Sequence, residues 1–297
     1  MDKITFELKD KAKELLRNKQ VDLIIGYARA ADGISATPCF IDSEADADKL
    51  VWDAYCVYNL AGYLKDFPGK IKGILAKDCD VKTITVLLQE NQLKREELFI
   101  IGVECLGVIS DKVAGLTDKQ ESEINFAEKC KTCKLQTSSY CDILIKEEGK
   151  KQEAPKIEKD EYEPVRKLEA KSLEERLKFW KEEFSSCIRC HACRQVCPLC
   201  YCPRCIADQS MPAYFSKAVN LEGNFSWNIM RAMHLAGRCI NCGECERACP
   251  MGIPLSEINN KIAKDIKELF KYEAGQTIEQ KALFSCFDKN DPADFIK

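Results

Sequence analysis

Cysteine spacing constrains this chain more than any other feature. The segments CIRCHACRQVCP (residues 187–198) and CINCGECERACP (residues 239–250) both read Cys-x2-Cys-x2-Cys-x3-Cys-Pro. Three thiolates at this spacing wrap one corner of a cubane cluster, and the fourth, followed by proline, points toward a neighbouring cluster. Structural zinc sites more often show two well-separated cysteine pairs. The sequence therefore predicts two [4Fe–4S] clusters in the C-terminal half.

The two motifs are expected to exchange their fourth ligands. In two-cluster ferredoxins the last cysteine of each motif binds the cluster of the other motif. The predicted ligands of the first cluster are Cys187, Cys190, Cys193 and Cys249. Those of the second are Cys239, Cys242, Cys245 and Cys197. The long segment between the motifs must then loop out while the two motifs pack together.

Composition excludes several other classes of protein. The chain has 297 residues and 19 cysteines, and its N-terminus alternates acidic and basic residues, which is not typical of a signal or transit peptide. Without a secretory signal, clustered cysteines more often bind metal than form disulfides. The formal net charge of -3 does not favour nucleic acid, and no apolar run reaches the ~20 residues of a membrane span. We expect a soluble, cytoplasmic protein in an anaerobic or low-potential setting.

The N-terminal half alternates strand and helix patterns. Strands are predicted at residues 21–28, 37–41, 71–76, 98–104 and 142–145, and helices at residues 4–17, 45–64 and 81–90, the last with Asp80 as its N-cap. This alternation is typical of a parallel sheet with helices on its faces. We predict an α/β domain over residues 1–145, a charged linker over 146–171, and a dicluster ferredoxin domain with flanking helices over 172–297.

Four further cysteines fall near one edge of the predicted sheet. Cys79 and Cys105 each follow a predicted strand, and Cys130 and Cys133 form a Cys-x2-Cys pair in the next loop. Ligands of open α/β sheets bind at the carboxyl ends of the strands. Four thiolates converging there would complete a third [4Fe–4S] site. The alternative is that Cys79 and Cys105 are small buried apolar residues.

The segment from Val21 to Ile145 resembles the β subunits of deazaflavin-dependent hydrogenases and formate dehydrogenases. The matching motifs are LAKDCD around Cys79, GVEC ending at Cys105, CKTC at residues 130–133, and the pair Asp142–Ile143. The resemblance implies Cys79, Cys105, Cys130 and Cys133 as the ligands of a third cluster, and Cys141 is an extra thiol that could replace one of them. The family also binds FAD through a glycine-rich segment, for which this sequence has no counterpart.

The C-terminal half resembles dicluster subunits of heterodisulfide-reductase-type and flavin-linked hydrogenase complexes. The segment LCYCPRC recurs there after the first motif, and a segment like HLAGRC opens the second. Cys200, Cys202 and Cys205 could bind a further metal, or they could pack around the neighbouring cluster.

These patterns favour a non-catalytic electron-transfer subunit of a multi-subunit oxidoreductase. Clusters in series would relay single electrons between partners, which the resemblance implies to be heterodisulfide-reductase-type, hydrogenase, formate dehydrogenase or flavoprotein subunits. The alternative is a flavin-containing reductase subunit that exchanges hydride with a deazaflavin or nicotinamide, since a flavin splits the electron pair of a hydride. A third hypothesis is a purely structural iron–sulfur or zinc scaffold.

Overall fold

The computed structural model describes residues 3–110, 126–133, 140–146, 160–214, 216–285 and 289. The chain divides into two compact units, Met1–Asp160 and Glu161–Lys297. Half of the segment predicted as a charged linker, residues 147–159, lies outside the described residues. Among the helices in these ranges, none has the length and apolar character needed to cross a membrane.

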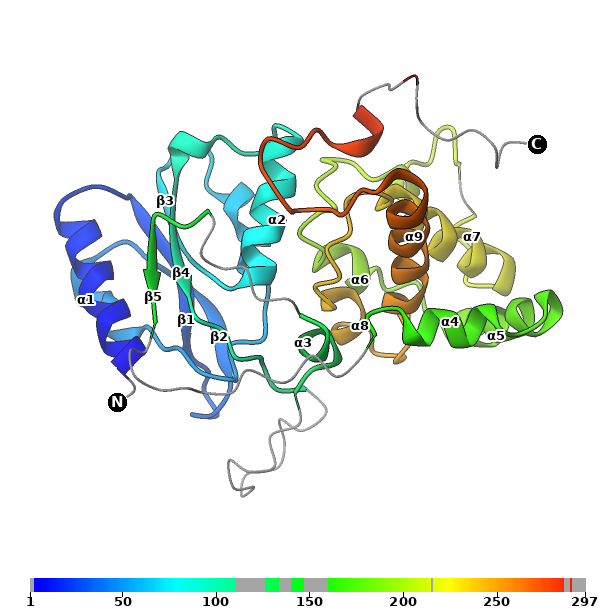
Figure 1. Ribbon diagram of the computed structural model, residues 1–297, viewed down its shortest axis with the longest axis horizontal. Coiled ribbons are helices and arrows are strands. Elements are labelled where there is room, and N and C mark those ends of the chain that lie inside the picture. Colours follow the sequence, from blue (N-terminus) through cyan, green and yellow to red (C-terminus); the bar gives the residue numbers. More distant parts are fainter. Residues whose placement is uncertain are drawn as a thin grey trace. The chain divides into compact units, whose positions relative to one another are not determined.

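A five-stranded sheet forms the centre of the first unit (Figure 1). Its strands are β1 (Leu23–Arg29), β2 (Ala36–Ile41), β3 (Lys72–Ala76), β4 (Leu98–Val103) and β5 (Ile143–Ile145), in the order β2-β1-β3-β4-β5. The pairs β1–β3, β3–β4 and β4–β5 are parallel, and β2 is antiparallel to β1. The apolar strands β1 and β3 are buried almost throughout, as a sheet covered on both faces requires. The predicted α/β class is confirmed, with β2 making the sheet mixed.

Two helices cover opposite faces of this sheet, α1 (Lys3–Arg17) and α2 (Asp78–Gln89) (Figure 1). On α1 the residues Leu8, Ala12 and Leu15 recur at helical spacing and are fully buried. Shorter elements are the 3-10 helix η3 (Arg95–Glu97) and the helical turn α3 (Glu128–Lys131). Cysteine-containing segments follow the carboxyl ends of β3 and β4 directly.

The prediction of one long helix over residues 45–64 is wrong. Two short 3-10 helices, η1 (Glu44–Lys49) and η2 (Leu60–Asp66), flank a non-helical segment. The backbone N–H of Val51 donates to the carbonyl of Tyr27 at 2.9 Å, and Ala28 and Leu50 form a β-bridge. These bonds to β1 take the place of intrahelical hydrogen bonds. Asn59 then begins η2 by accepting a hydrogen bond from the N–H of Ala61 at 3.1 Å.

A buried ion pair joins the start of α2 to its surroundings. Lys77 Nζ lies 3.1 Å from Asp80 Oδ2, and the two side chains are 2% and 0% exposed. Asp80 was predicted as the N-cap of α2, but Lys77 is the N-cap and Asp80 is the third helical residue, whose carboxylate accepts from the Lys77 N–H at 2.9 Å. Asp80 also accepts from the N–H of Leu60 at 2.6 Å, and Lys77 donates to Tyr27 and to the Tyr58 carbonyl. Burial works to lower the pKa of Lys77, but Asp80 and the thiols of Cys79, Cys105 and Cys56 together outweigh it and the pKa is raised.

Replacing Lys77 by methionine is expected to destabilise the first unit by about 3–5 kcal/mol, because Asp80 becomes a buried charge without its cation. Hydrogen exchange of the β1 and β3 amides in the full chain should then be at least roughly a hundredfold faster. The matched control Lys11→Met removes a surface pair with Glu14 and should cost less than about 1 kcal/mol. Equal exchange in the two variants would contradict the structural importance of this pair.

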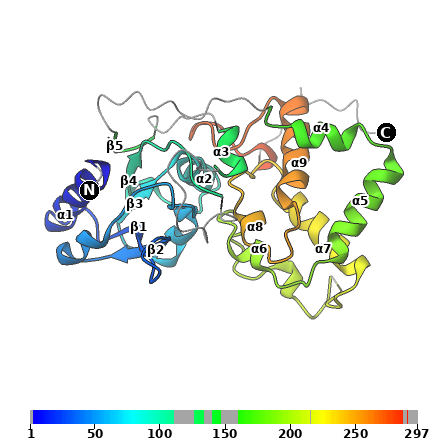
Figure 2. The same cartoon turned by 90° about the horizontal axis from the view of Figure 1, so that it is seen from below.

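The second unit is built from helices joined by cysteine-rich loops. Its elements are α4 (Glu163–Glu169), α5 (Leu173–Ser185), α6 (Ala192–Gln195), η7 (Ile206–Asp208), α7 (Leu221–His234), α8 (Glu244–Arg247), α9 (Leu255–Phe270) and η8 (Leu283–Ser285). Ser172 and Glu175 cap α5 reciprocally, and the Asn220 side chain caps α7. The short helices α6 and α8 lie next to each other (Figure 2). Phe184, Ala232 and Ile258 bring α5, α7 and α9 together in one apolar cluster.

Candidate iron–sulfur sites

The two cysteine motifs of the second unit share one backbone conformation. Arg189 and His191 have φ of 54° and 60°, and the equivalent residues of the second motif, Asn241 and Gly243, have φ of 57° and 73°. In each motif the second of these left-handed residues precedes a short helix, α6 or α8. Left-handed turns of this kind point successive backbone N–H groups into one concavity, which favours anionic groups such as iron–sulfur clusters. The sequence repeat is therefore also a structural repeat.

Cysteines of the two motifs are electrostatic neighbours across the repeat. The pKa of Cys193 is raised by burial, and Cys187, Cys249 and Cys190 raise it further. This is the set predicted for the first cluster. Three of the four thiols predicted for the second cluster also gather, because Cys197 and Cys239 both act on Cys245. Cys249 thus acts on Cys193 of the first motif, and Cys197 acts on Cys239 and Cys245 of the second, as the predicted exchange of ligands requires.

Backbone and side-chain donors already point at several of these sulfurs. Cys239 accepts from the N–H of Asn241, and Asn259 Nδ2 lies 3.7 Å from Cys245 Sγ. Burial raises the pKa of Cys239 to about 11 and that of Cys245 to about 12. Cluster binding needs thiolates, so assembly on these cysteines would release protons. Donors to sulfur also stabilise the more negative, reduced form of a bound cluster.

Helix α7 supports the first motif from a distant part of the sequence. Asn224 is buried, and its Nδ2 donates to the carbonyls of Phe184 at 3.1 Å and Cys187 at 2.7 Å. The ring of His191 packs edge-on against Trp227 with centroids 4.6 Å apart. Nothing in the local sequence of α7 indicates that Asn224 and Trp227 lie beside a cluster motif, so neither residue was predicted.

The three thiols after the first motif have different surroundings. A hydrogen bond with Cys197 is the largest cause that raises the pKa of Cys200, and Cys205 accepts a hydrogen bond from Arg194. Cys202 is exposed. Cys200 therefore lies beside a predicted cluster ligand. The extra metal site on Cys200, Cys202 and Cys205 stays a prediction.

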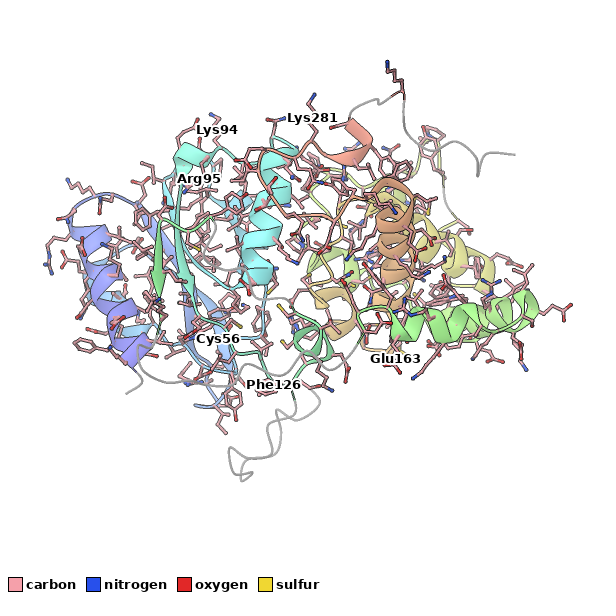
Figure 3. All side chains as sticks on the ribbon, in the orientation of Figure 1. Cys56, Lys94, Arg95, Phe126, Glu163 and Lys281 are labelled. Carbon is pink, nitrogen blue, oxygen red and sulfur yellow. The ribbon has the colours of Figure 1, made fainter. Side chains whose placement is uncertain are left out.

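In the first unit, the four predicted ligands lie at the carboxyl ends of β3 and β4. Cys79 is in the first turn of α2, which follows β3, and Cys105 comes two residues after β4. Cys133 is within electrostatic reach of Cys105 and Cys130, and Cys79 is within reach of Cys105. Figure 3 shows Cys56 and Phe126 toward this end of the sheet, and Lys94 and Arg95 at the opposite end.

Local contacts hold the Cys130 loop against the Cys105 loop. Ile109 and Phe126 form a β-bridge, and the N–H of Val108 donates to Cys130 Sγ at 3.3 Å. Gly107 has φ of 114°, and a Cβ there would lie 2.8 Å from the Phe126 ring. A glycine is therefore required for this close approach. The N–H of Gly107 also donates to Cys105.

Burial dominates the acidity of Cys79, Cys105 and Cys133. It raises the pKa of Cys105 to about 11 and that of Cys133 to about 12, and it also raises the pKa of Cys79. The cations Lys77 and Lys129 act in the opposite direction on Cys79. Four partly shielded thiols, with amide donors and nearby lysines, fit an anionic cluster.

Cys141 packs against β4, and Asp78 acts on it as it does on Cys105 and Cys133. A Cβ on Gly102 of β4 would be 2.3 Å from Cys141 Sγ, so the thiol sits directly on the strand. Burial raises its pKa to about 11, and the charged groups that act on it are Asp78, Asp142 and Arg95.

Among the described residues, no group of three or more His, Cys, Asp or Glu side chains is spaced to hold a single metal ion. A tetrahedral zinc site needs sulfurs about 3.8 Å apart, since each lies about 2.3 Å from the metal. A four-iron cluster binds one thiolate at each iron and so needs a wider spacing.

Comparison with known proteins gives these groups a context. Residues 183–253 match the model of the 4Fe-4S dicluster domain, which spans both motifs. The β subunit of an F420-dependent formate dehydrogenase from Methanocaldococcus jannaschii is 24% identical, over 92% of this chain and 92% of its own length. These matches support an iron–sulfur β-subunit family. The β subunit of F420-dependent formate dehydrogenase 1 from Methanococcus maripaludis is 23% identical, over 89% of this chain and 88% of its own length.

The resemblance predicted from the sequence is therefore confirmed for this β-subunit family, as is the dicluster domain. A solved chain of the xenon-derivatised F420-reducing [NiFe] hydrogenase complex from Methanosarcina barkeri is also similar, at 17% identity. The match covers 36% of this chain and 40% of that chain, with a TM-score of 0.31.

Proposed function

We propose that this β-subunit-like chain relays single electrons through three [4Fe–4S] clusters between partner subunits of an oxidoreductase complex. The observation that supports the proposal is that predicted ligands act electrostatically on one another in each of the three sets, two in the dicluster domain and one at the carboxyl edge of the sheet. Each cluster would accept and release one electron. The chain would supply thiolates, burial and N–H donors that hold each cluster and set its potential.

The residues that would hold the clusters divide as follows. The first cluster takes Cys187, Cys190, Cys193 and Cys249, the second Cys239, Cys242, Cys245 and Cys197, and the third Cys79, Cys105, Cys130 and Cys133. Donors to sulfur come from the N–H groups of Asn241, Gly107 and Val108. These N–H donors stabilise the reduced, more negative form of a cluster, so they favour electron uptake.

The partner is inferred from the names of the relatives, which are β subunits of F420-dependent formate dehydrogenases. We infer that the chain assembles with a catalytic subunit of that type, whose substrate oxidation supplies the electrons. The same names favour the second candidate function, a flavin-containing reductase that passes hydride to a deazaflavin. That function needs a flavin, because a cluster takes one electron and a hydride carries two.

Analysis of the anaerobically purified chain tests both functions. Iron, acid-labile sulfide and flavin are measured per chain, and the electrons taken up are counted by titration with dithionite. The relay predicts about twelve irons, an equal amount of sulfide, about three electrons and no flavin. The reduced chain should also pass its electrons singly to a one-electron viologen dye.

Other results would redirect or overturn the proposal. About eight irons would restrict the relay to the dicluster domain. About one flavin per chain would favour the reductase. A colourless chain without iron would overturn both and favour a structural scaffold.

A further inference from the structure

A buried arginine lies between the two cysteine motifs of the second unit. Arg231 is on α7, in the long segment between the motifs, and is only 4% exposed. Its Nη2 donates to the carbonyl of Cys193 at 2.9 Å, while its Nε is buried without a hydrogen-bond partner. A buried donor left without an acceptor is costly, so the site lacks a group that the protein is built to receive.

The surroundings of Arg231 indicate the charge of that group. None of the ion pairs in the described part of the chain includes Arg231, whereas Arg194 and Arg247 of the two motifs pair with Asp208 and Glu244. Burial works to lower the pKa of its guanidinium, but neighbouring thiolates outweigh it and the pKa is raised. The contributing thiolates are Cys245, Cys197, Cys193 and Cys200, which come from both motifs. A buried cation without a carboxylate needs another anion.

The rest of α7 explains why the arginine is held there. Asn224 and Arg231 are two helical turns apart and both buried. Asn224 donates to the carbonyl of Cys187, and Arg231 donates to the carbonyl of Cys193. One face of α7 is thereby fastened to the first motif at two points. The guanidinium is thereby held at the first motif, and Cys245 of the second motif is the thiol that acts on it most strongly.

We propose that Arg231 is a counter-charge shared by both clusters of the dicluster domain, and that it raises the reduction potential of each. The inference rests on the proposed function, because it requires both clusters. A cluster with four thiolate ligands is anionic and becomes more negative on reduction, so a fixed cation favours the reduced state. In this role Arg231 acts through its charge on clusters that the cysteines hold.

The test compares two substitutions at Arg231 in the full chain. R231Q removes the charge and keeps a donor for the Cys193 carbonyl, whereas R231K keeps the charge. Midpoint potentials are measured by redox titration followed by electron paramagnetic resonance, together with the iron content. The matched control Arg166→Gln removes the same charge from the exposed face of α4.

We expect R231Q to be at least tenfold less reduced at a given ambient potential, at both clusters of the dicluster domain. For a one-electron couple this is a shift of about 59 mV to lower potential. R231K and Arg166→Gln should keep potentials close to those of the wild type. Wild-type potentials in R231Q, or a shift in only one cluster, would overturn the shared counter-charge.

If R231Q loses iron, the R231K variant shows whether the missing charge is the cause. If R231Q does not load its clusters, wild-type loading and potentials in R231K support the requirement for a charge. Lowered potentials in R231K would then overturn the proposal. Failure of the relay itself is recognised separately, because it would appear as missing iron or missing viologen reduction in the wild-type chain.

Discussion

The variant Cys197→Ala is expected to lose the cluster of the second motif while keeping the cluster of its own motif. Cys197 acts on both Cys239 and Cys245, whereas Cys193 is surrounded by Cys187, Cys190 and Cys249. Removing a ligand removes one corner of a cluster, so about four irons of about twelve should be lost or made labile. Iron and sulfide analysis of the anaerobic full chain provides the first measurement.

Double variants identify the cluster that is lost. If Cys197 and Cys239 bind the same cluster, the double variant Cys197→Ala/Cys239→Ala should lose no more iron than either single variant. Combining Cys197→Ala with Cys187→Ala should instead lose about eight irons, because both clusters are then damaged. The opposite pattern would mean that each motif binds its own cluster without exchange of ligands.

A cysteine outside the three groups provides the control. Cys39 lies on β2, and burial raises its pKa to about 11, while no other cysteine contributes to that shift. Cys39→Ala should therefore leave the iron content and the magnetic resonance spectrum unchanged. A loss of iron from this variant would show that cysteine removal lowers cluster loading without regard to position, and iron loss would then not identify ligands.

The second large effect is expected for Cys105→Ala. Cys105 lies after β4 and within electrostatic reach of Cys79, Cys130 and Cys133. We expect the loss of about four irons and of one electron in the dithionite titration, with the dicluster signals unchanged. The dicluster domain belongs to the other compact unit, so its own ligands remain intact.

Cys141→Ala distinguishes the two candidate ligand sets of the third cluster. Cys141 packs on Gly102 of β4, whereas Cys105 and Cys130 both act on Cys133. We therefore expect full iron content in Cys141→Ala. Iron loss in Cys141→Ala together with normal iron in Cys133→Ala would show that Cys141 replaces Cys133 as a ligand.

Predictions that depended on short stretches of sequence agree well with the structure. The apolar runs at residues 21–28, 71–76 and 98–104 form β1, β3 and β4, because continuous apolar strands are stable only in a covered sheet. The two cysteine motifs also share one backbone conformation, which follows from their common spacing and from residues that take left-handed φ at equivalent positions.

Predictions that depended on distant contacts fared worse. The segment over residues 50–59 looked helical, yet Val51 bonds to Tyr27 and Leu50 pairs with Ala28. Asp80 was predicted as an N-cap, but it is the third residue of α2 and forms a buried ion pair with Lys77, which is the N-cap. In both cases a partner elsewhere in the fold competes with the local helical preference.

The sequence by itself determined the class of this protein: an α/β domain followed by a dicluster domain, with eight cysteines whose ligand chemistry follows from their spacing. Such spacing acts over a few residues, where the covalent chain limits how far the thiols can separate. Only the tertiary structure decided that Asn224 and Arg231 contact the first motif, 37 and 38 residues away along the chain. It also decided that Cys141 packs on β4. Contacts of this range depend on how whole elements pack, which no local pattern encodes.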